Sequence, residues 1–205
     1  MDAVYIRKVL CSLEGIYTEK LGYLSELDGA IGDGDHGTSM VRGFAAVRQA
    51  LEDGPDMDIP ALFTQCGKLL MQRIGGTCGP LYAMLFIKGA AAVAGLQRLD
   101  TQDYCRFWSE GAAGLMALGK AAPGEKTMVD ALWPAVEALK TAAEREDGVW
   151  AAAKAAADAA EQGAQSTRGM LATKGRGRYQ GDASLGHVDA GAASMAILLR
   201  AFCAG

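Results

Sequence analysis

The segment from residue 10 to residue 24, "LCSLEGIYTEKLGYL", decides the fold class. Its large apolar residues recur at intervals of three and four, at Leu10, Leu13, Tyr17, Leu21 and Leu24. This spacing places them along one face of an α-helix, whereas a half-buried β-strand would alternate at every second residue. The segment therefore predicts one long amphipathic helix near the N-terminus.

The same periodicity continues along the chain. Further helices are expected near residues 40–52 and 80–95, after Pro60, and over segments that begin close to residues 107, 129, 150 and 192. Pro134 should kink the helix near residue 129 or move its start. Because no alternating strand, Pro/Ser-rich linker or internal repeat occurs, residues 1–205 are expected to form a single all-α domain of about eight helices.

The composition excludes several classes of function. A net charge of −4 and a pI near 5.2 argue against a nucleic-acid partner. Five scattered cysteines without a C-x-x-C pair argue against a disulfide framework and against structural zinc. The charged N-terminus is no signal peptide, and no uncharged run is long enough to cross a membrane. A soluble, cytoplasmic protein without a membrane partner is expected.

Glycine-rich stretches interrupt the helical pattern at residues 28–39, 75–80 and 175–191, and a shorter one covers residues 119–126. Helical bundles need only short connections, so long glycine-rich breaks call for a functional explanation. Loops held by a rigid scaffold are where binding and catalysis concentrate.

The first of these stretches combines glycines with the carboxylates Asp28, Asp33 and Asp35. A Rossmann turn is excluded because a helix, not a strand, precedes it. An EF-hand is excluded because its sixth and twelfth positions would be Thr38 and Phe44. A site in which carboxylates hold Mg²⁺ against phosphate fits best. Taken alone, the stretch leaves open a turn whose aspartates merely cap helices.

The other stretches carry groups suited to anions. Residues 75–80 predict a backbone nest before a helix start. Arg176 and Arg178 offer fixed positive donors, and Asp189 precedes another helix start. Together with the carboxylates, these stretches indicate nucleotide-phosphate chemistry. Because no Walker A motif occurs, this chemistry would not use a P-loop.

Four motifs together resemble the nucleotide-binding L subunit of dihydroxyacetone kinase, the DhaL family, over essentially the whole chain. They are "LDGAIGDGDHGTSM" (27–40), "GGTCGPLYAM" (75–84), "GKAAPGEKTMVDAL" (119–132) and "GRGRYQGDASLGHVDAGA" (175–192). The resemblance implies a barrel of eight antiparallel helices with ADP, or ATP as its phosphorylated form, bound at one end.

The resemblance also implies roles for individual residues. Asp28, Asp33 and Asp35 would hold two Mg²⁺ ions and, with Arg176, act in catalysis. The groups implied to contact the nucleotide phosphates and ribose are His36, Gly37, Thr38, Ser39, Thr77 and Cys78. Those implied to line or close the adenine side are Gly119, Met128, Arg176, Asp189, Ala190 and Gly191.

The implied reaction is phosphoryl transfer to dihydroxyacetone held on a separate K subunit. In the phosphoenolpyruvate-dependent version, a phosphohistidine M subunit rephosphorylates the ADP in place. The occurrence of the L segment alone favours this version. The resemblance leaves open whether the chain forms a homodimer.

Three residues depart from the family pattern: Ser39 stands in place of Asn, Cys78 in place of Ser and Ala190 in place of Pro. These departures leave two alternatives open. The chain could act on another small ketose or a fatty acyl carrier, or it could be a non-catalytic nucleotide-binding regulatory module.

Overall fold

A computed structural model describes residues 1–203 of the chain. Within these residues it contains nine α-helices, two short 3₁₀ helices and no β-strand. The elements are α1 (Ala3–Glu19), α2 (Leu21–Ile31), α3 (His36–Glu52), α4 (Ile59–Arg73), α5 (Cys78–Ala92), α6 (Thr101–Gly119), α7 (Val129–Glu144), α8 (Val149–Ser166), η1 (Thr167–Gly169), η2 (Gly177–Ser184) and α9 (Ala190–Ala201). The all-α prediction is confirmed.

The helix starts follow the capping rules. The carboxylates of Asp2, Asp58, Asp100 and Asp189 each accept a hydrogen bond from a backbone N–H in the first turn of α1, α4, α6 and α9. Such caps satisfy N–H groups that have no partner within the helix. None of the helices between residues 1 and 203 is long and apolar enough to cross a membrane.

The prediction of a single helix over residues 10–24 is wrong in one respect. The helix ends at Glu19, and α2 begins at Leu21 after a break at Lys20. The break lets α2 pack closely on α3, because the Leu21 carbonyl lies against Gly37 with no room for a side chain between them. The apolar residues that recur from Leu10 to Leu24 are therefore divided between two helices, α1 and α2.

Two other boundaries also differ from expectation. The carboxylate stretch is mostly helical, since only residues 32–35 separate α2 from α3, and Asp28 lies in the last turn of α2. Pro134 does not move the start of its helix, which begins at Val129. The carbonyl of Asp130, which Pro134 leaves without its usual helical N–H donor, instead lies against the backbone of Gly163 on α8.

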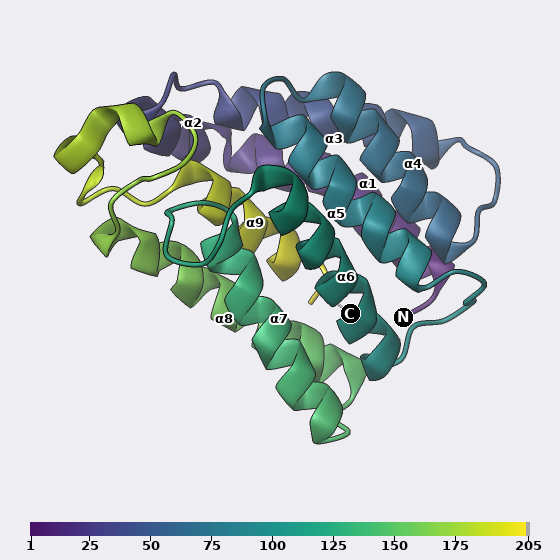
Figure 1. The fold of residues 1–205 in the computed structure, drawn as a ribbon. Coiled ribbons are helices and arrows are strands. Elements are labelled where there is room, and N and C mark those ends of the chain that lie inside the picture. Colours follow the sequence, from purple (N-terminus) through teal and green to yellow (C-terminus); the bar gives the residue numbers. More distant parts are fainter. Residues whose placement is uncertain (204–205) are drawn as a thin grey trace.

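Neighbouring helices pack in sequence from α3 to α8, and α1 packs against α3 (Figure 1). Helix α9 contacts α8, α7, α1 and α2, and it lies between α1 and α8. Nine of its twelve residues are buried, as expected for a helix that is enclosed on nearly all sides. It ends beside Phe202, whose ring packs among Phe63, Tyr104 and Trp108.

Candidate functional site

A cavity of about 540 Å³ lies where α2 ends and α3, α5 and α9 begin. It collects segments from the glycine-rich stretches at residues 28–39, 75–80, 119–126 and 175–191. Most of the residues that the sequence predicts for the site line it, namely Asp28, Asp33, Asp35, His36, Ser39, Thr77, Cys78, Gly119, Met128, Arg176, Asp189, Ala190 and Gly191.

The two remaining predicted residues, Gly37 and Thr38, do not line the cavity. Gly37 is buried at the α2–α3 contact, where an added Cβ would lie 2.4 Å from the Leu21 carbonyl oxygen. Thr38 is exposed on α3. Their predicted contact with a nucleotide stays a prediction, and it would involve the backbone N–H groups of the first turn of α3.

The three aspartates form a compact cluster. One carboxylate oxygen from each of Asp28, Asp33 and Asp35 lies within 4.8 Å of those from the other two. Asp33 and Asp35 are exposed, while Asp28 is partly buried and accepts a hydrogen bond from the backbone N–H of His36 at 3.2 Å. Two like charges about 4 Å apart repel by roughly 4 kcal/mol at an effective dielectric near 20, so the cluster favours cations.

Glycines make this arrangement sterically possible. A Cβ on Gly32 would lie 2.4 Å from Oδ1 of Asp28, so any side chain there would displace that carboxylate. Gly34 has a φ of +77°, a conformation that other residues rarely adopt. The connection from α2 to α3 therefore holds three carboxylates together only because it contains these two glycines.

The charge and chemistry of the cluster fit Mg²⁺. The guanidinium of Arg176 contacts the carboxylate of Asp33, so three negative groups face one positive group. The cluster keeps a net negative charge and offers hard oxygen donors, which are the ligands that Mg²⁺ prefers. Phosphate oxygens and water would complete its octahedral coordination. Asp28, Asp33 and Asp35 are the residues that would hold it.

At two helix starts that face the cavity, the N-cap residue gives no side-chain cap, although the first N–H of α3, that of His36, donates to Asp28. Asp35 at the start of α3 and Thr77 at the start of α5 make no side-chain hydrogen bond to the first turn of their helices. Uncapped N–H groups together with the helix dipole favour a bound anion. Because these starts flank the carboxylate cluster, a cation bound there would face an anion bound at the helix ends.

Burial changes the ionisation of the side chains at the back of the cavity. Desolvation raises the pKa of the Asp189 carboxyl to about 7, although the N–H of Ala192 donates to it. Desolvation, reinforced by Asp189, raises the pKa of the Cys78 thiol to about 12, so this cysteine is not an activated nucleophile. Desolvation lowers the pKa of His36, which favours its neutral form.

The sequence did not identify several residues that line the cavity. An apolar wall could accept a flat aromatic base, and it is formed by Leu81, Leu115, Ala121, Val129 and Ala172. Lys126 is 2% exposed, and its ammonium donates to the carbonyls of Thr167 and His187. Residues 119–132, which contain Lys126, form one of the four DhaL-like motifs, but nothing in that stretch indicated a buried ammonium.

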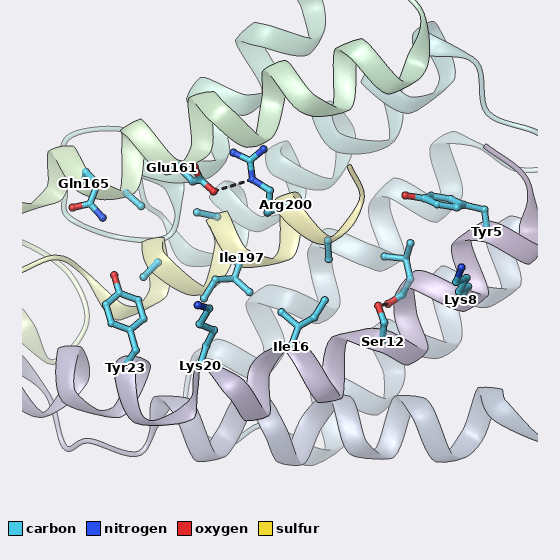
Figure 2. A pocket seen from close by; sticks show the side chains of 15 residues that line it. Tyr5, Lys8, Ser12, Ile16, Lys20, Tyr23, Glu161, Gln165, Ile197 and Arg200 are labelled. Atoms are coloured by element: carbon cyan, nitrogen blue, oxygen red, sulfur yellow. Dashed lines mark hydrogen bonds and ion pairs between the residues drawn. The ribbon is translucent and has the colours of Figure 1, made fainter. Parts of the chain in front are cut away.

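A second, somewhat larger cavity of about 650 Å³ lies over α9 between α1 and α8. Figure 2 shows Lys8, Ser12 and Ile16 of α1 along one side, Glu161 and Gln165 of α8 along the other, and Ile197 of α9 between them. Glu161, which lines it, is paired with Arg200 at 2.8 Å. Among the described residues that line this cavity there is no cluster of metal-binding groups, so the chemistry points to the smaller cavity.

A sequence profile described as the DAK2 domain matches residues 30–204. The ADP-binding subunit DhaL of phosphoenolpyruvate-dependent dihydroxyacetone kinase from Escherichia coli is 40% identical over 185 residues, which cover 90% of this chain and 88% of that protein. This chain belongs to the DAK2 domain family. The resemblance to DhaL subunits is confirmed.

Further comparisons agree with this DAK2 assignment. The ADP-binding subunit DhaL of a phosphotransferase-system-dependent dihydroxyacetone kinase from Lactococcus lactis is 40% identical over 192 residues, covering 90% of each chain. The dihydroxyacetone kinase of C. freundii, solved in complex with AMP-PNP and Mg²⁺, superposes with a TM-score of 0.75 at 24% identity. That match covers 99% of this DAK2 chain and 34% of the larger kinase, and it shows the shared fold.

Proposed function

We propose that this chain is the ADP-binding subunit of a phosphoenolpyruvate-dependent dihydroxyacetone kinase in the cytoplasm. The single observation that carries this function is the meeting of the Asp28, Asp33 and Asp35 cluster with the uncapped starts of α3 and α5 in one cavity. Relatives that are 40% identical over most of their length bear the same function in their names, which supports the proposal.

The proposed chemistry is phosphoryl transfer. When bound, two Mg²⁺ ions would neutralise charge on the β- and γ-phosphates. The three aspartates would hold those ions, and backbone N–H groups at the starts of α3 and α5 would donate to the phosphate oxygens. Arg176, which contacts Asp33 and lines the same cavity, would supply a guanidinium that stabilises charge developing during transfer.

The apolar wall of the cavity supports a place for the adenine ring. Leu81, Leu115 and Met128 come from α5, α6 and the loop before α7, and all three line the cavity. An adenine held against them would direct its phosphates toward the carboxylate cluster. Gly119, Ala190 and Gly191 would border the adenine ring and the ribose, because these small residues leave the cavity free for the nucleotide.

We further propose that a K-type subunit supplies dihydroxyacetone and that an M-type phosphohistidine subunit rephosphorylates the ADP. The exposed side chains of Asp33 and Arg176 support this arrangement, because the proposed phosphate end of the cavity is open to a partner protein. The nucleotide would then remain bound as a cofactor while the two partners exchange on the same face.

The nucleotide content of the purified protein tests this function. The protein would be denatured before and after dialysis against EDTA, and any released nucleotide identified and quantified. We expect close to one ADP per chain, retained until the metal is chelated. The absence of nucleotide, together with no binding of ADP or ATP when Mg²⁺ is restored, would contradict the proposal.

A further inference from the structure

A group of buried hydrogen bonds lies directly behind the cavity and centres on Ser194 of α9. Its Oγ lies 2.8 Å from Nε2 of His36, 2.8 Å from the hydroxyl of Tyr82 and 3.0 Å from the carbonyl oxygen of Gly191. Ser194 and Tyr82 are fully buried, and neither lines the cavity, whereas His36 does. The group therefore connects the interior of the bundle to a side chain of the site.

Counting protons assigns the donors in this group. Each of the three short contacts needs one proton between its two heavy atoms. Ser194 supplies one proton and two acceptor lone pairs. If it donates to the Gly191 carbonyl, its oxygen can accept from both the Tyr82 hydroxyl and Nε2–H of His36. All three contacts are then hydrogen bonds.

The alternative assignments each leave a contact without a proton. If Ser194 donated to Nε2 of His36, its oxygen and the Gly191 oxygen would face each other at 3.0 Å as two acceptors. If it donated to Tyr82, the Tyr82 hydroxyl could donate in turn to that of Tyr17. The same repulsion between Ser194 and Gly191 would remain, however. The carbonyl of Ser194 already accepts from Tyr17 at 2.8 Å. Buried polar groups without a partner are costly, so the first assignment is favoured.

The contact that the other ring nitrogen of His36, Nδ1, makes is consistent with this assignment. Nδ1 of His36 lies 3.8 Å from Sγ of Cys78, at the start of α5. A thiol is a weak donor with one proton, so it can donate to a bare Nδ1. In the neutral ring, a proton on Nε2 leaves Nδ1 as that acceptor. Both ring nitrogens are then satisfied.

We propose that Ser194 and Tyr82 are positioning residues that hold His36 as the Nε2–H tautomer, with Nδ1 as an acceptor beside Cys78 and the cavity. An acceptor at this place accepts a hydrogen bond from a hydroxyl or thiol group. The network also joins the start of α3 at His36, the start of α5 at Cys78 and the start of α9 at Gly191. It thereby fixes the three helix ends that surround the proposed nucleotide.

The role of this network in nucleotide binding rests on the proposed function, but the tautomer can be read independently of it. The chain contains only two histidines, His36 and His187, so ¹⁵N-labelled histidine gives a simple long-range ¹H–¹⁵N spectrum. His187→Gln assigns the signals. At about pH 8, above the ordinary histidine pKa, and without nucleotide or metal, we expect His36 to carry its proton on Nε2. A proton on Nδ1 would overturn the tautomer assignment.

Ser194→Ala tests the positioning role. We expect both tautomers of His36 to become populated and the Kd for Mg–ADP to rise about fivefold, the size expected for one lost hydrogen bond. Ser166→Ala is the matched control, because Ser166 makes the same bond to the carbonyl three residues earlier, at 2.7 Å to Gly163, away from the cavity. It should change neither quantity. An unchanged Kd in folded Ser194→Ala would overturn the positioning role.

Tyr82→Phe covers the case in which Ser194→Ala does not fold. It should leave the proton on Nε2, because Ser194 still accepts it, and should raise the Kd for Mg–ADP about twofold. An unchanged Kd would again overturn the positioning role. A wild-type chain that bound no Mg–ADP would overturn the proposed function and the positioning role together, while the spectrum would still decide the tautomer.

Discussion

The guanidinium of Arg176 contacts the carboxylate of Asp33, so the loop before η2 closes over the connection between α2 and α3. Both side chains remain well exposed, at 62% and 42%. Exposed ion pairs contribute between nothing and about 1 kcal/mol to stability. The pair therefore contributes more to the arrangement of the site than to the stability of the fold.

Arg176→Ala should separate these two contributions. We expect the free energy of unfolding to change by less than about 1 kcal/mol, measured by urea denaturation. The affinity for Mg–ADP should fall about tenfold, measured by calorimetry, because a charge-assisted contact to phosphate is lost. Arg106→Ala, which removes an exposed pair with Asp103 outside the site, should leave nucleotide affinity unchanged. Equal affinities in all three proteins would refute the role of Arg176.

Asp35→Asn removes one charge from the carboxylate cluster while keeping the shape of the side chain. In EDTA the variant should be as stable as the wild type or more stable by up to about 1 kcal/mol, because like-charge repulsion falls. Mg²⁺ should raise the Tm of the wild type, since a ligand of the folded state stabilises it, and this rise should shrink in the variant. Thermal unfolding with and without Mg²⁺ measures both. A full Mg²⁺ effect in the variant would argue against metal binding by Asp35.

Gly32→Ala tests the geometry of the cluster without changing any carboxylate. The added Cβ would lie 2.4 Å from Oδ1 of Asp28, so the carboxylate must move and Mg²⁺ affinity should fall at least tenfold. Gly29→Ala is the control, three residues earlier on α2, where the nearest atom would be 4.0 Å away. That change should leave Mg²⁺ binding intact and stabilise the helix by up to about 1 kcal/mol. Calorimetric titration with Mg²⁺ compares them, and similar losses in both variants would contradict the steric explanation.

The raised pKa of Asp189 predicts that the free energy of unfolding of the metal-free protein depends on pH. Its pKa is about 7 in the folded chain, against 3.8 for an ordinary aspartate, because of desolvation. Between about pH 4 and pH 7 the unfolded chain loses this proton first, so the folded chain binds more protons there. The free energy of unfolding should therefore fall as pH rises, by at most about 1.4 kcal/mol per unit from this group.

Asp189→Asn isolates that contribution, because asparagine caps a helix as well as aspartate does. Urea denaturation at several pH values in EDTA should give a less negative slope for the variant between about pH 4 and pH 7. Parallel slopes would show that Asp189 ionises normally in the folded chain.

Lys126→Met should destabilise the fold near the site. The ammonium of Lys126 bridges the carbonyls of Thr167 and His187, and the substitution leaves both without this donor. We expect a loss of about 2 kcal/mol in the free energy of unfolding, measured by urea denaturation. Lys120→Met is the control, since Lys120 is exposed and also has a positive φ. Equal stability of both variants would refute a structural role for Lys126.

Local patterns predicted the helices and singled out the glycine-rich segments that line the candidate cavity, since both depend on short-range signals. The spacing of Leu10, Leu13 and Tyr17 indicates a helix wherever those residues are later packed. The glycines at 32 and 34 indicate an unusual backbone beside carboxylates. These features need no knowledge of which segments meet in space.

Features that depend on long-range packing could not be predicted. The break at Lys20 accompanies the close contact of the Leu21 carbonyl with Gly37, and the local sequence around neither residue indicates that contact. Lys126 is buried because η1 and the segment before α9 supply carbonyls to it. The hydrogen bond between His36 and Ser194 joins residues that are 158 positions apart. Such pairs are determined by tertiary structure alone.

The enclosed position of α9 has a consequence for biosynthesis. Hydrogen bonds from α9 and from Phe202, which follows it, reach back to the first helix, with 177 positions between Tyr17 and Ser194 and 197 between Tyr5 and Phe202. Contacts of such high sequence separation form late, because a long loop must close before they are made. A ribosome-bound chain that has not yet released residues 189–202 lacks both Asp189 and the central helix. The complete cavity therefore cannot assemble until this segment has emerged from the ribosome.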